Sequence, residues 1–245
     1  MKKKNFKILV TLGPSSLTKK FLIFAKASSV SLLRLNMSHI EANKLEKIIK
    51  FIRKWNNKTP ICIDTEGAQI RTKVKKKQFL SKGKELKLFR RNGNFNLYPL
   101  DVFEKLKVRD ILLIGFENLA AKISKVEKEF IKMKVIAQGT LESNKGVHIK
   151  NRLVKLNYLT DKDFKAIEIG KKNNVKNFAL SFTNNLQDIH KFKKILKKEN
   201  KIYKLETMSA IRNLKNIVKK GNNFLIDRGD LSKETKIEKI PLYQR

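Results

Sequence analysis

The sequence predicts an α/β protein in which parallel strands alternate with helices and a small all-β domain is inserted. Near both ends of the chain, short apolar runs alternate with longer amphipathic segments, which is typical of parallel strands joined by right-handed helical crossovers. Between about residues 73 and 145 this alternation stops, and short β-type runs separated by turn residues replace it. We therefore expect an α/β body over residues 1–72 and 146–245, interrupted by a β domain over residues 73–145.

Short apolar runs define the expected strands, because each is bounded by polar or turn residues. In the body they are Lys7–Leu12, Val30–Leu35, Ile61–Asp64, Asn177–Ser181, Ile202–Leu205 and Asn223–Ile226. In the insertion they are Glu85–Phe89, Asn94–Tyr98, Ile111–Ile114, Ala120–Ile123 and Phe130–Val135.

Amphipathic segments between the body strands are the expected helices. Ser16 is the expected cap of the first, and the third opens at Thr160 with a Thr-Asp-Lys-Asp sequence similar to a capping box. The first segment begins near Leu17, the second covers Glu41–Trp55 and the third begins at Thr160. The fourth covers Leu186–Lys198 and the fifth covers Ala210–Lys220.

The net charge of +35 comes from 57 Lys and Arg against 22 Asp and Glu. A charge of this size is compatible with a nucleic-acid or anionic-membrane partner. Only ten of the cations are Arg, however, and Arg is the residue whose bidentate fork suits the reading of bases and phosphates. The lysines also spread along the whole chain. We interpret the charge as a compositional bias, with polyanion binding as the alternative, and expect no nucleic-acid or membrane partner.

The expected location is the cytoplasm. The lysine-rich N-terminus is followed by the apolar run Ile8–Val10, which is too short for a secretion signal. No window approaches the 18 or so apolar residues of a membrane-spanning helix. The single cysteine, Cys62, excludes an internal disulfide framework and a Cys-rich metal site, and its apolar neighbours predict a buried position in a strand.

Polar residues gather where the expected strands end, and parallel α/β barrels carry their chemistry at this edge. Arg34, Asn36 and Ser38 lie at the end of the second strand and share one face, because side chains alternate with a period of two. Asp64 and Thr65 lie at the end of the third strand. Asn36 and Ser38 could instead cap the next helix, so the placement on successive strand ends is what favours a site.

Two carboxylates, Glu206 and Asp230, follow the fifth and sixth strands. Such a pair suits Mg²⁺ or Mn²⁺, which take hard oxygen ligands and leave positions for substrate oxygens. Lys204 beside them can stabilise charge on a transferring phosphoryl group. A lone Lys-x-Glu is usually a surface pair, and an Arg-Gly-Asp sequence is usually an ordinary loop.

Seven short motifs follow one another along the chain: Thr11–Ser16, Arg34–His39, Asp64–Thr72, Lys145–Val147, Leu180–Phe182, Lys204–Glu206 and Arg228–Leu231. Taken in this order, they resemble the pyruvate kinase family over nearly the whole chain, most weakly over residues 73–143. The resemblance implies a partial TIM-type (β/α) barrel with the small all-β insertion as its lid domain. It also implies phosphoryl transfer from phosphoenolpyruvate to ADP, giving pyruvate and ATP, the last step of glycolysis.

The resemblance implies a role for each matching residue. Arg34 and Lys204 are the implied catalytic residues, which contact the phosphate and steady the transferred group. Glu206 and Asp230 are the implied Mg²⁺ or Mn²⁺ ligands. Substrate contacts are implied for Arg34, Lys204, Gly229 and Asp230, K⁺ contacts for Asn36, Ser38, Asp64 and Thr65, and nucleotide contacts for His39 and Arg71.

The chain also departs from the family. Gln69 stands where K⁺-dependent members commonly carry Glu, and Thr207 stands where the family has Asn after the metal-binding Glu. The family has an eight-stranded barrel and a further C-terminal domain, whereas six strands are expected here before Arg245. Because open parallel edges need a partner, we expect a homo-oligomer or a second chain that completes the barrel.

These departures leave two alternatives to turnover open. One is a non-catalytic or repurposed relative that binds Mg²⁺ and phospho-ligands or a partner chain. The other is a metal-dependent enolpyruvate enzyme of another reaction type, in which Glu206 and Asp230 would still hold the metal.

Overall fold

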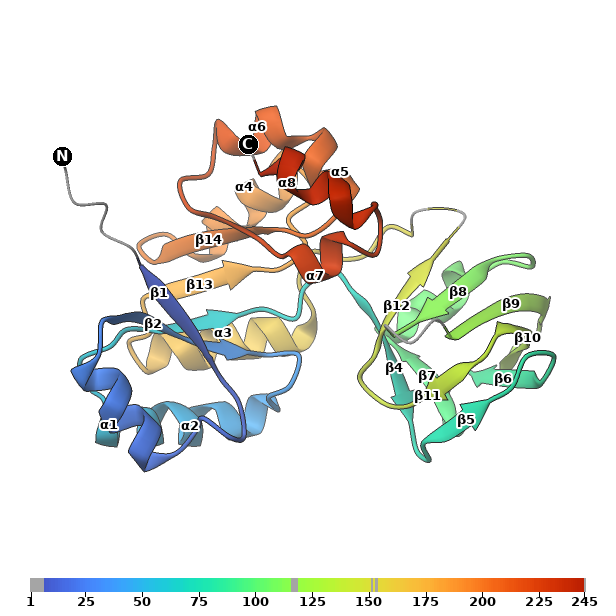
Figure 1. Ribbon diagram of the computed structural model, residues 1–245, viewed down its shortest axis with the longest axis horizontal. Helices are drawn as coiled ribbons and strands as arrows, with labels where there is room; N and C mark the ends of the chain where they lie inside the picture. The colour runs from blue at the N-terminus through green and yellow to red at the C-terminus, as the bar shows by residue number, and fades with distance from the viewer. Residues whose placement is uncertain (1–6, 116–118, 151, 153, 245) are drawn as a thin grey trace. The chain divides into compact units, whose positions relative to one another are not determined.

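The computed structural model describes residues 7–115, 119–150, 152 and 154–244 (Figure 1). The chain divides into two compact units, Met1–Ala68 with Tyr158–Arg245, and Gln69–Asn157. The second unit is wider than the insertion expected over residues 73–145. Strand β4 (Ile70–Val74) pairs within it, and at its other end Lys105 Nζ donates to Lys155 O at 3.0 Å. Strands alternating with helices confirm the α/β class.

The first unit is built on one six-stranded sheet of order β1-β2-β3-β13-β14-β15, in which each pairing is parallel. Each strand lies within two residues of the range expected from the sequence. The observed strands are β1 (Ile8–Leu12), β2 (Val30–Asn36), β3 (Ile61–Asp64), β13 (Asn177–Leu180), β14 (Asn200–Leu205) and β15 (Phe224–Ile226).

Helices α1 to α6 lie between these strands in the sequence, and α7, η2 and α8 follow β15. The sequence predicted α1 to α4 as separate helices, but not α7, η2 or α8. The capping box at the start of α3 is confirmed, since Thr160 Oγ1 accepts from Asp163 N and the Asp163 carboxylate accepts from Thr160 N. The helices are α1 (Lys19–Ala27), α2 (Ala42–Trp55), α3 (Asp161–Lys172), α4 (Leu186–Ile195), α5 (Met208–Arg212), α6 (Leu214–Val218), α7 (Arg228–Leu231), the 3-10 helix η2 (Ile237–Lys239) and α8 (Ile240–Tyr243).

Two details of the expected helices were wrong. Thr18 caps α1, whereas the Ser16 hydroxyl accepts from Gly13 N in the preceding turn. The helix expected over Ala210–Lys220 is two short helices separated by Asn213, whose side-chain amide donates to Ser209 O and Asn184 O. Asn side chains compete in this way with the backbone ladder of a helix.

The main core of the first unit lies between the sheet and its helices. Alternate residues of β2 and the turn after it, Leu33, Leu35 and Met37, are fully buried, and they belong to one cluster with Leu45 and Ile49 of α2. Burial of this kind, at about 1.5–3 kcal/mol for each large apolar side chain, is the main stabilising contribution. The period of two sends the intervening residues of β2 to the opposite face.

The described residues of the second unit form β strands and one 3-10 helix around a separate apolar core. Its seven-stranded sheet has the order β6-β10-β9-β8-β12-β4-β7, and β11 and β5 form a two-stranded sheet; the pairings are antiparallel. The elements are β4, β5 (Gln78–Leu80), β6 (Glu85–Phe89), β7 (Phe95–Tyr98), η1 (Leu100–Lys105), β8 (Ile111–Ile114), β9 (Leu119–Val126), β10 (Phe130–Ala137), β11 (Gly139–Leu141) and β12 (Gly146–Ile149). None of the described helices in either unit has the length and apolarity needed to cross a membrane.

Candidate active site

The parallel sheet builds the site by alternation of side chains along four neighbouring strands. One face begins with a small apolar cluster of Leu32, Cys62 and Ala179, against which Ile202 packs. Because side chains alternate with a period of two, the residues two positions further along each strand share this face. Those residues are all polar or charged: Arg34, Asp64, Ser181 and Lys204.

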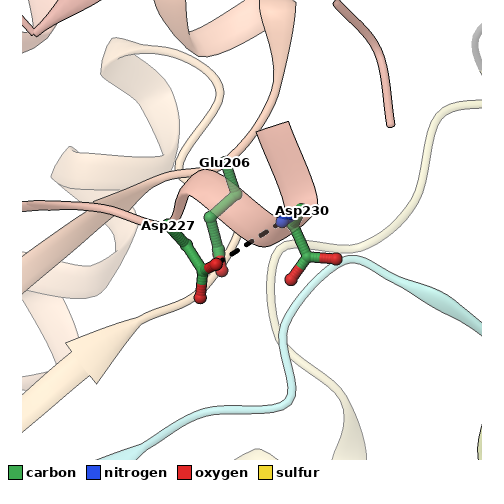
Figure 2. A group of neighbouring side chains, drawn as sticks. All are labelled: Glu206, Asp227 and Asp230. Carbon is green, nitrogen blue, oxygen red and sulfur yellow. Dashed lines mark hydrogen bonds between the residues drawn. The ribbon is translucent and has the colours of Figure 1, made fainter. Parts of the chain in front are cut away.

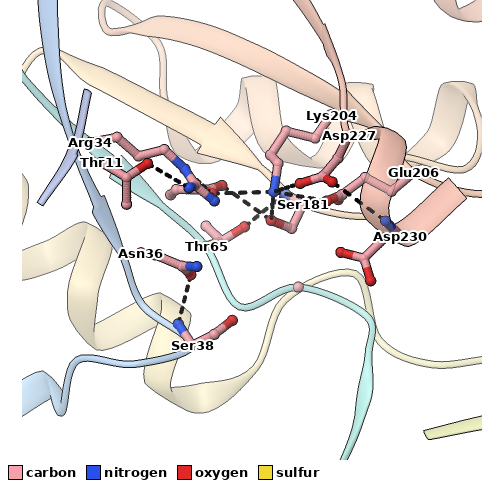
Figure 3. Close-up of polar contacts among 12 residues, drawn as sticks. Thr11, Arg34, Asn36, Ser38, Thr65, Ser181, Lys204, Glu206, Asp227 and Asp230 are labelled. Carbon is pink, nitrogen blue, oxygen red and sulfur yellow. Dashed lines mark hydrogen bonds and ion pairs between the residues drawn. The ribbon is translucent and has the colours of Figure 1, made fainter. Parts of the chain in front are cut away.

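Lys204 is the centre of this group and is only 4% exposed. Its Nζ lies 2.8 Å from Glu206 Oε1, 3.3 Å from Asp64 Oδ2 and 3.7 Å from Asp227 Oδ2 (Figure 3). It also donates to Ser181 Oγ at 3.2 Å. Burial by itself lowers the pKa of Lys204, but Asp64 and Glu206 outweigh it and hold the pKa above the usual value of lysine.

Asp64 is fully buried and is shared by two cations. Arg34 Nε donates to its Oδ2 at 2.7 Å, and Arg34 Nη2 contacts the same oxygen. Ser181 Oγ donates to its Oδ1 at 3.1 Å. Arg34 is anchored further by Thr11 Oγ1, which accepts from its Nη1 at 2.9 Å. The sequence pointed to Arg34 and Asp64 but not to their direct ion pair, because a strand pattern does not show which ends lie adjacent.

Glu206 follows β14 and is almost completely buried. Its Oε2 accepts from Phe182 N at 2.6 Å, and its Oε1 is the oxygen paired with Lys204. Burial raises the pKa of Glu206 to about 7, with Lys204 acting in the opposite direction. Near neutral pH the carboxyl group can therefore gain or lose a proton.

Three carboxylates, Glu206, Asp227 and Asp230, each offer one oxygen within 4.8 Å of the others (Figure 2). Asp227 was not among the residues proposed from the sequence, although it directly follows the apolar run of β15. It caps α7, where its Oδ1 accepts from Gly229 N at 3.2 Å and Asp230 N at 3.4 Å. Gly229 and Asp230, expected at a strand end, thus lie in a short helix. Lys233 Nζ lies 2.5 Å from Asp230 Oδ1.

The donor chemistry of this trio fits Mg²⁺ or Mn²⁺, since both ions prefer a few carboxylate oxygens and keep other positions for substrate or water. Asp227 adds a third carboxylate to the pair that the sequence suggested.

The four residues suggested for K⁺ lie on the ends of β2 and β3, which are joined by a bond from Met37 N to Asp64 O at 2.9 Å. Asn36 Oδ1 accepts from Ser38 N at 3.0 Å, and Thr65 Oγ1 accepts from Ser181 N at 3.0 Å. Their oxygens are of the kind that hard cations take. The carboxylate of Asp64, however, is already paired with two protein cations.

The two suggested nucleotide contacts lie in different units. His39 is exposed in the turn after β2. Arg71 lies on β4 of the second unit, where its Nη1 donates to Asn144 O at 3.3 Å. Thr207, a departure from the family pattern, caps α5 by accepting from Ala210 N at 3.1 Å. The site of the first unit is therefore formed by Arg34, Asp64, Lys204 and the acidic trio.

A parallel α/β sheet with its charged groups at the carboxyl ends of the strands is the arrangement found in α/β enzymes. The first unit is thus of the α/β class. The chain belongs to the pyruvate kinase family: a family model described as "Pyruvate kinase, barrel domain" matches residues 3–245.

Curated relatives agree with this assignment. Plastidial pyruvate kinase 3 of Arabidopsis thaliana is 28% identical over 97% of this chain and 44% of its own length. The pyruvate kinase of Thermotoga maritima is 28% identical over 98% of this chain and 54% of its own length. The pyruvate kinase of Chlamydia muridarum is 27% identical over 98% of this chain and 53% of its own length. The chain thus spans about half the length of these relatives.

Proposed function

We propose that the chain performs pyruvate kinase-type phosphoryl transfer, from phosphoenolpyruvate to ADP, giving pyruvate and ATP. The observation that carries the proposal is Lys204, a buried ammonium that lies 2.8 to 3.7 Å from the carboxylates of Glu206, Asp64 and Asp227. Phosphoryl transfer requires positioning and electrostatic stabilisation more than covalent chemistry. A preorganised cluster of this kind supplies both.

In this proposal Lys204 and Arg34 bind and orient the phosphate of phosphoenolpyruvate. Both side chains are held by Asp64, so their positions are fixed before the substrate arrives. Preorganised cations stabilise developing charge without reorganising during the reaction. Gly229 and Asp230 complete the substrate contacts. His39 and Arg71 are the proposed nucleotide contacts.

Glu206, Asp227 and Asp230 would hold Mg²⁺ or Mn²⁺. When bound, this ion would neutralise charge on the phosphoryl oxygens and polarise them as a Lewis acid. The residues proposed for K⁺ remain Asn36, Ser38, Asp64 and Thr65. Asp64 already pairs with Arg34 and Lys204, so in this proposal a K⁺ ion would draw mainly on the oxygens of Asn36, Ser38 and Thr65.

We further propose that the six parallel strands are part of a TIM-type barrel and that the second unit is its lid domain. In the described residues β1 and β15 each pair on one side only, and Ile8 and Leu9 of β1 are 49% and 41% exposed. Open parallel edges of this kind favour association. The proposed partner is a second copy of the chain or a second chain that completes the barrel, in the cytoplasm. Light scattering tests this, and a folded monomer at micromolar protein would contradict it.

A coupled assay of pyruvate formation tests the reaction. Wild-type protein should turn over phosphoenolpyruvate with ADP and Mg²⁺, and Glu206→Gln and Lys204→Met should each reduce the rate by about a hundredfold or more. Glu199→Gln is a matched control, because Glu199 precedes β14 and Glu206 follows it. Wild-type activity no higher than that of both site variants would overturn the proposal.

A second candidate is a relative that binds Mg²⁺ and phospho-ligands without phosphoryl transfer to ADP, or that uses the enolpyruvate in another reaction. The observation that favours it is the trio of Glu206, Asp227 and Asp230, whose carboxylates suit a divalent ion whichever reaction follows. Binding of phosphoenolpyruvate that depends on Mn²⁺ and on Glu206, with no ATP formed, would favour this candidate.

A further inference from the structure

The fully buried carboxylate of Asp163 connects the start of α3 to the turn that follows β3. Its Oδ1 accepts from Glu66 N at 2.6 Å, and its Oδ2 accepts from Gly67 N at 3.0 Å and from Thr160 N at 3.0 Å. Two of these three donors lie almost a hundred residues away in the sequence. The carboxylate therefore fixes a turn that its own helix does not contain.

The turn that Asp163 holds lies in close contact with Ser181, which directly follows β13. Gly67 has a φ of +70°, and a Cβ built there would lie 2.8 Å from both Cβ and O of Ser181. Ser181 in turn places its hydroxyl between the charged groups, donating to Asp64 Oδ1 at 3.1 Å and accepting from Lys204 Nζ at 3.2 Å. A continuous chain of contacts thus runs from Asp163 to the ammonium of Lys204.

Helix capping alone does not explain this arrangement, because α4 begins with the same motif and lacks the additional contacts. In α4, Asn185 Oδ1 accepts from Asp188 N, and the Asp188 carboxylate accepts from Asn184 N and Asn185 N. These contacts all stay at the start of α4. Burial raises the pKa of both Asp163 and Asp188, so both positions bear a desolvation cost. Only Asp163 makes bonds to a distant strand end.

We propose that Asp163 is a positioning residue for Lys204: it holds the Glu66–Gly67 turn against Ser181 and so fixes the Ser181 hydroxyl between Asp64 and Lys204. The inference rests on the proposed function for its effect on catalysis. Its structural part, the order of the turn, does not depend on turnover.

The test compares Asp163→Asn with the matched variant Asp188→Asn. Each places an amide NH₂ where a carboxylate accepted backbone N–H groups, so each helix start is weakened alike. Hydrogen exchange of the Gly67 and Ser181 amides should accelerate about tenfold or more in Asp163→Asn and stay unchanged in Asp188→Asn. If the enzyme turns over, kcat should fall about tenfold or more in Asp163→Asn only, with Mn²⁺ affinity unchanged.

Equal exchange in the two variants, or a kcat loss in Asp188→Asn as large as in Asp163→Asn, would overturn the inference. Should Asp163→Asn fail to fold, Ser181→Ala tests the contact of the Ser181 hydroxyl with Asp64 and Lys204. In this variant kcat should fall, while the Gly67 amide exchanges at the wild-type rate. An unchanged kcat in Ser181→Ala would also overturn it. Absence of turnover in wild-type protein would count against the proposed function, whereas the exchange result would still decide the role of Asp163.

Discussion

Replacing Lys204 by Met should destabilise the first unit mainly through the carboxylates that it leaves behind. The Lys204 side chain is 5% exposed, and Nζ lies 2.8 Å from Glu206 Oε1 and 3.3 Å from Asp64 Oδ2. Without the Lys204 ammonium, Asp64 still pairs with the cation of Arg34, whereas Glu206 still accepts a hydrogen bond from the neutral N–H of Phe182. Breaking a buried pair by removing one partner costs about 3–5 kcal/mol. Because Glu206 can relieve part of this by protonation, we expect a loss of about 3 kcal/mol at about pH 8.

The loss should depend on pH and on Glu206. The folded-state pKa of Glu206 is raised to about 7 and Lys204 holds it down, so the pKa rises further in Lys204→Met. A carboxyl whose folded pKa exceeds its unfolded value lowers stability as pH rises between the two values. The cost of Lys204→Met should therefore be small near pH 4 and complete above the folded pKa. Lys204→Met combined with Glu206→Gln should cost less than the sum of the single changes, by about 2 kcal/mol.

Urea unfolding followed by Trp55 fluorescence measures these costs. Trp55 is the only tryptophan and lies on α2, so the signal reports on the first unit alone. Additive single costs, or a loss below about 1 kcal/mol for Lys204→Met at about pH 8, would refute the electrostatic account of the site.

Three further predictions concern packing and titration. Gly67→Ala should lower the free energy of unfolding by about 2 kcal/mol, because the positive φ of Gly67 and its contact with Ser181 exclude a Cβ. Gly13→Ala should be nearly neutral, because a Cβ at Gly13 would meet nothing within 4 Å. Equal unfolding midpoints for the two variants would contradict this prediction. The hydroxyl of Tyr203 is buried without a hydrogen-bond partner among the described residues. Tyr203→Phe should therefore leave the free energy of unfolding unchanged or raise it by about 1 kcal/mol in the same urea assay. A clear loss of stability would contradict this prediction. Mn²⁺ affinity, measured by calorimetry, should fall as pH drops below about 7, because protons compete for Glu206; an affinity independent of pH would exclude Glu206 as a ligand.

Local patterns predicted much of the fold. The strands of the first unit follow from short apolar runs, and the period of two correctly placed Arg34 and Asn36 on one face of β2, opposite the buried Leu35. The capping box at Thr160 also follows from four residues. In the insertion, β4, β5, β11 and β12 were not predicted, because these strands are short and polar residues interrupt them.

The site was predictable only in part, because its geometry depends on which strand ends lie adjacent. Lys204, Glu206 and Asp230 were proposed from the sequence and lie close together, whereas Asp227 and Ser181, which lie beside them, were not proposed. Asp227 follows an apolar run directly, a signal that could have found it. Ser181 lies in the matching motif Leu180–Phe182, but no role was predicted for it, because its role depends on its distances to Asp64 and Lys204.

Mn²⁺ binding, followed by electron paramagnetic resonance, tests the central claim most directly. The account predicts a bound Mn²⁺ whose affinity falls about tenfold or more in Glu206→Gln and Asp227→Asn but not in Glu199→Gln. It also predicts that phosphoenolpyruvate strengthens Mn²⁺ binding in wild-type protein and not in Lys204→Met. Equal Mn²⁺ affinity in the wild type and the acidic-trio variants, or no effect of phosphoenolpyruvate in any of them, would contradict the account.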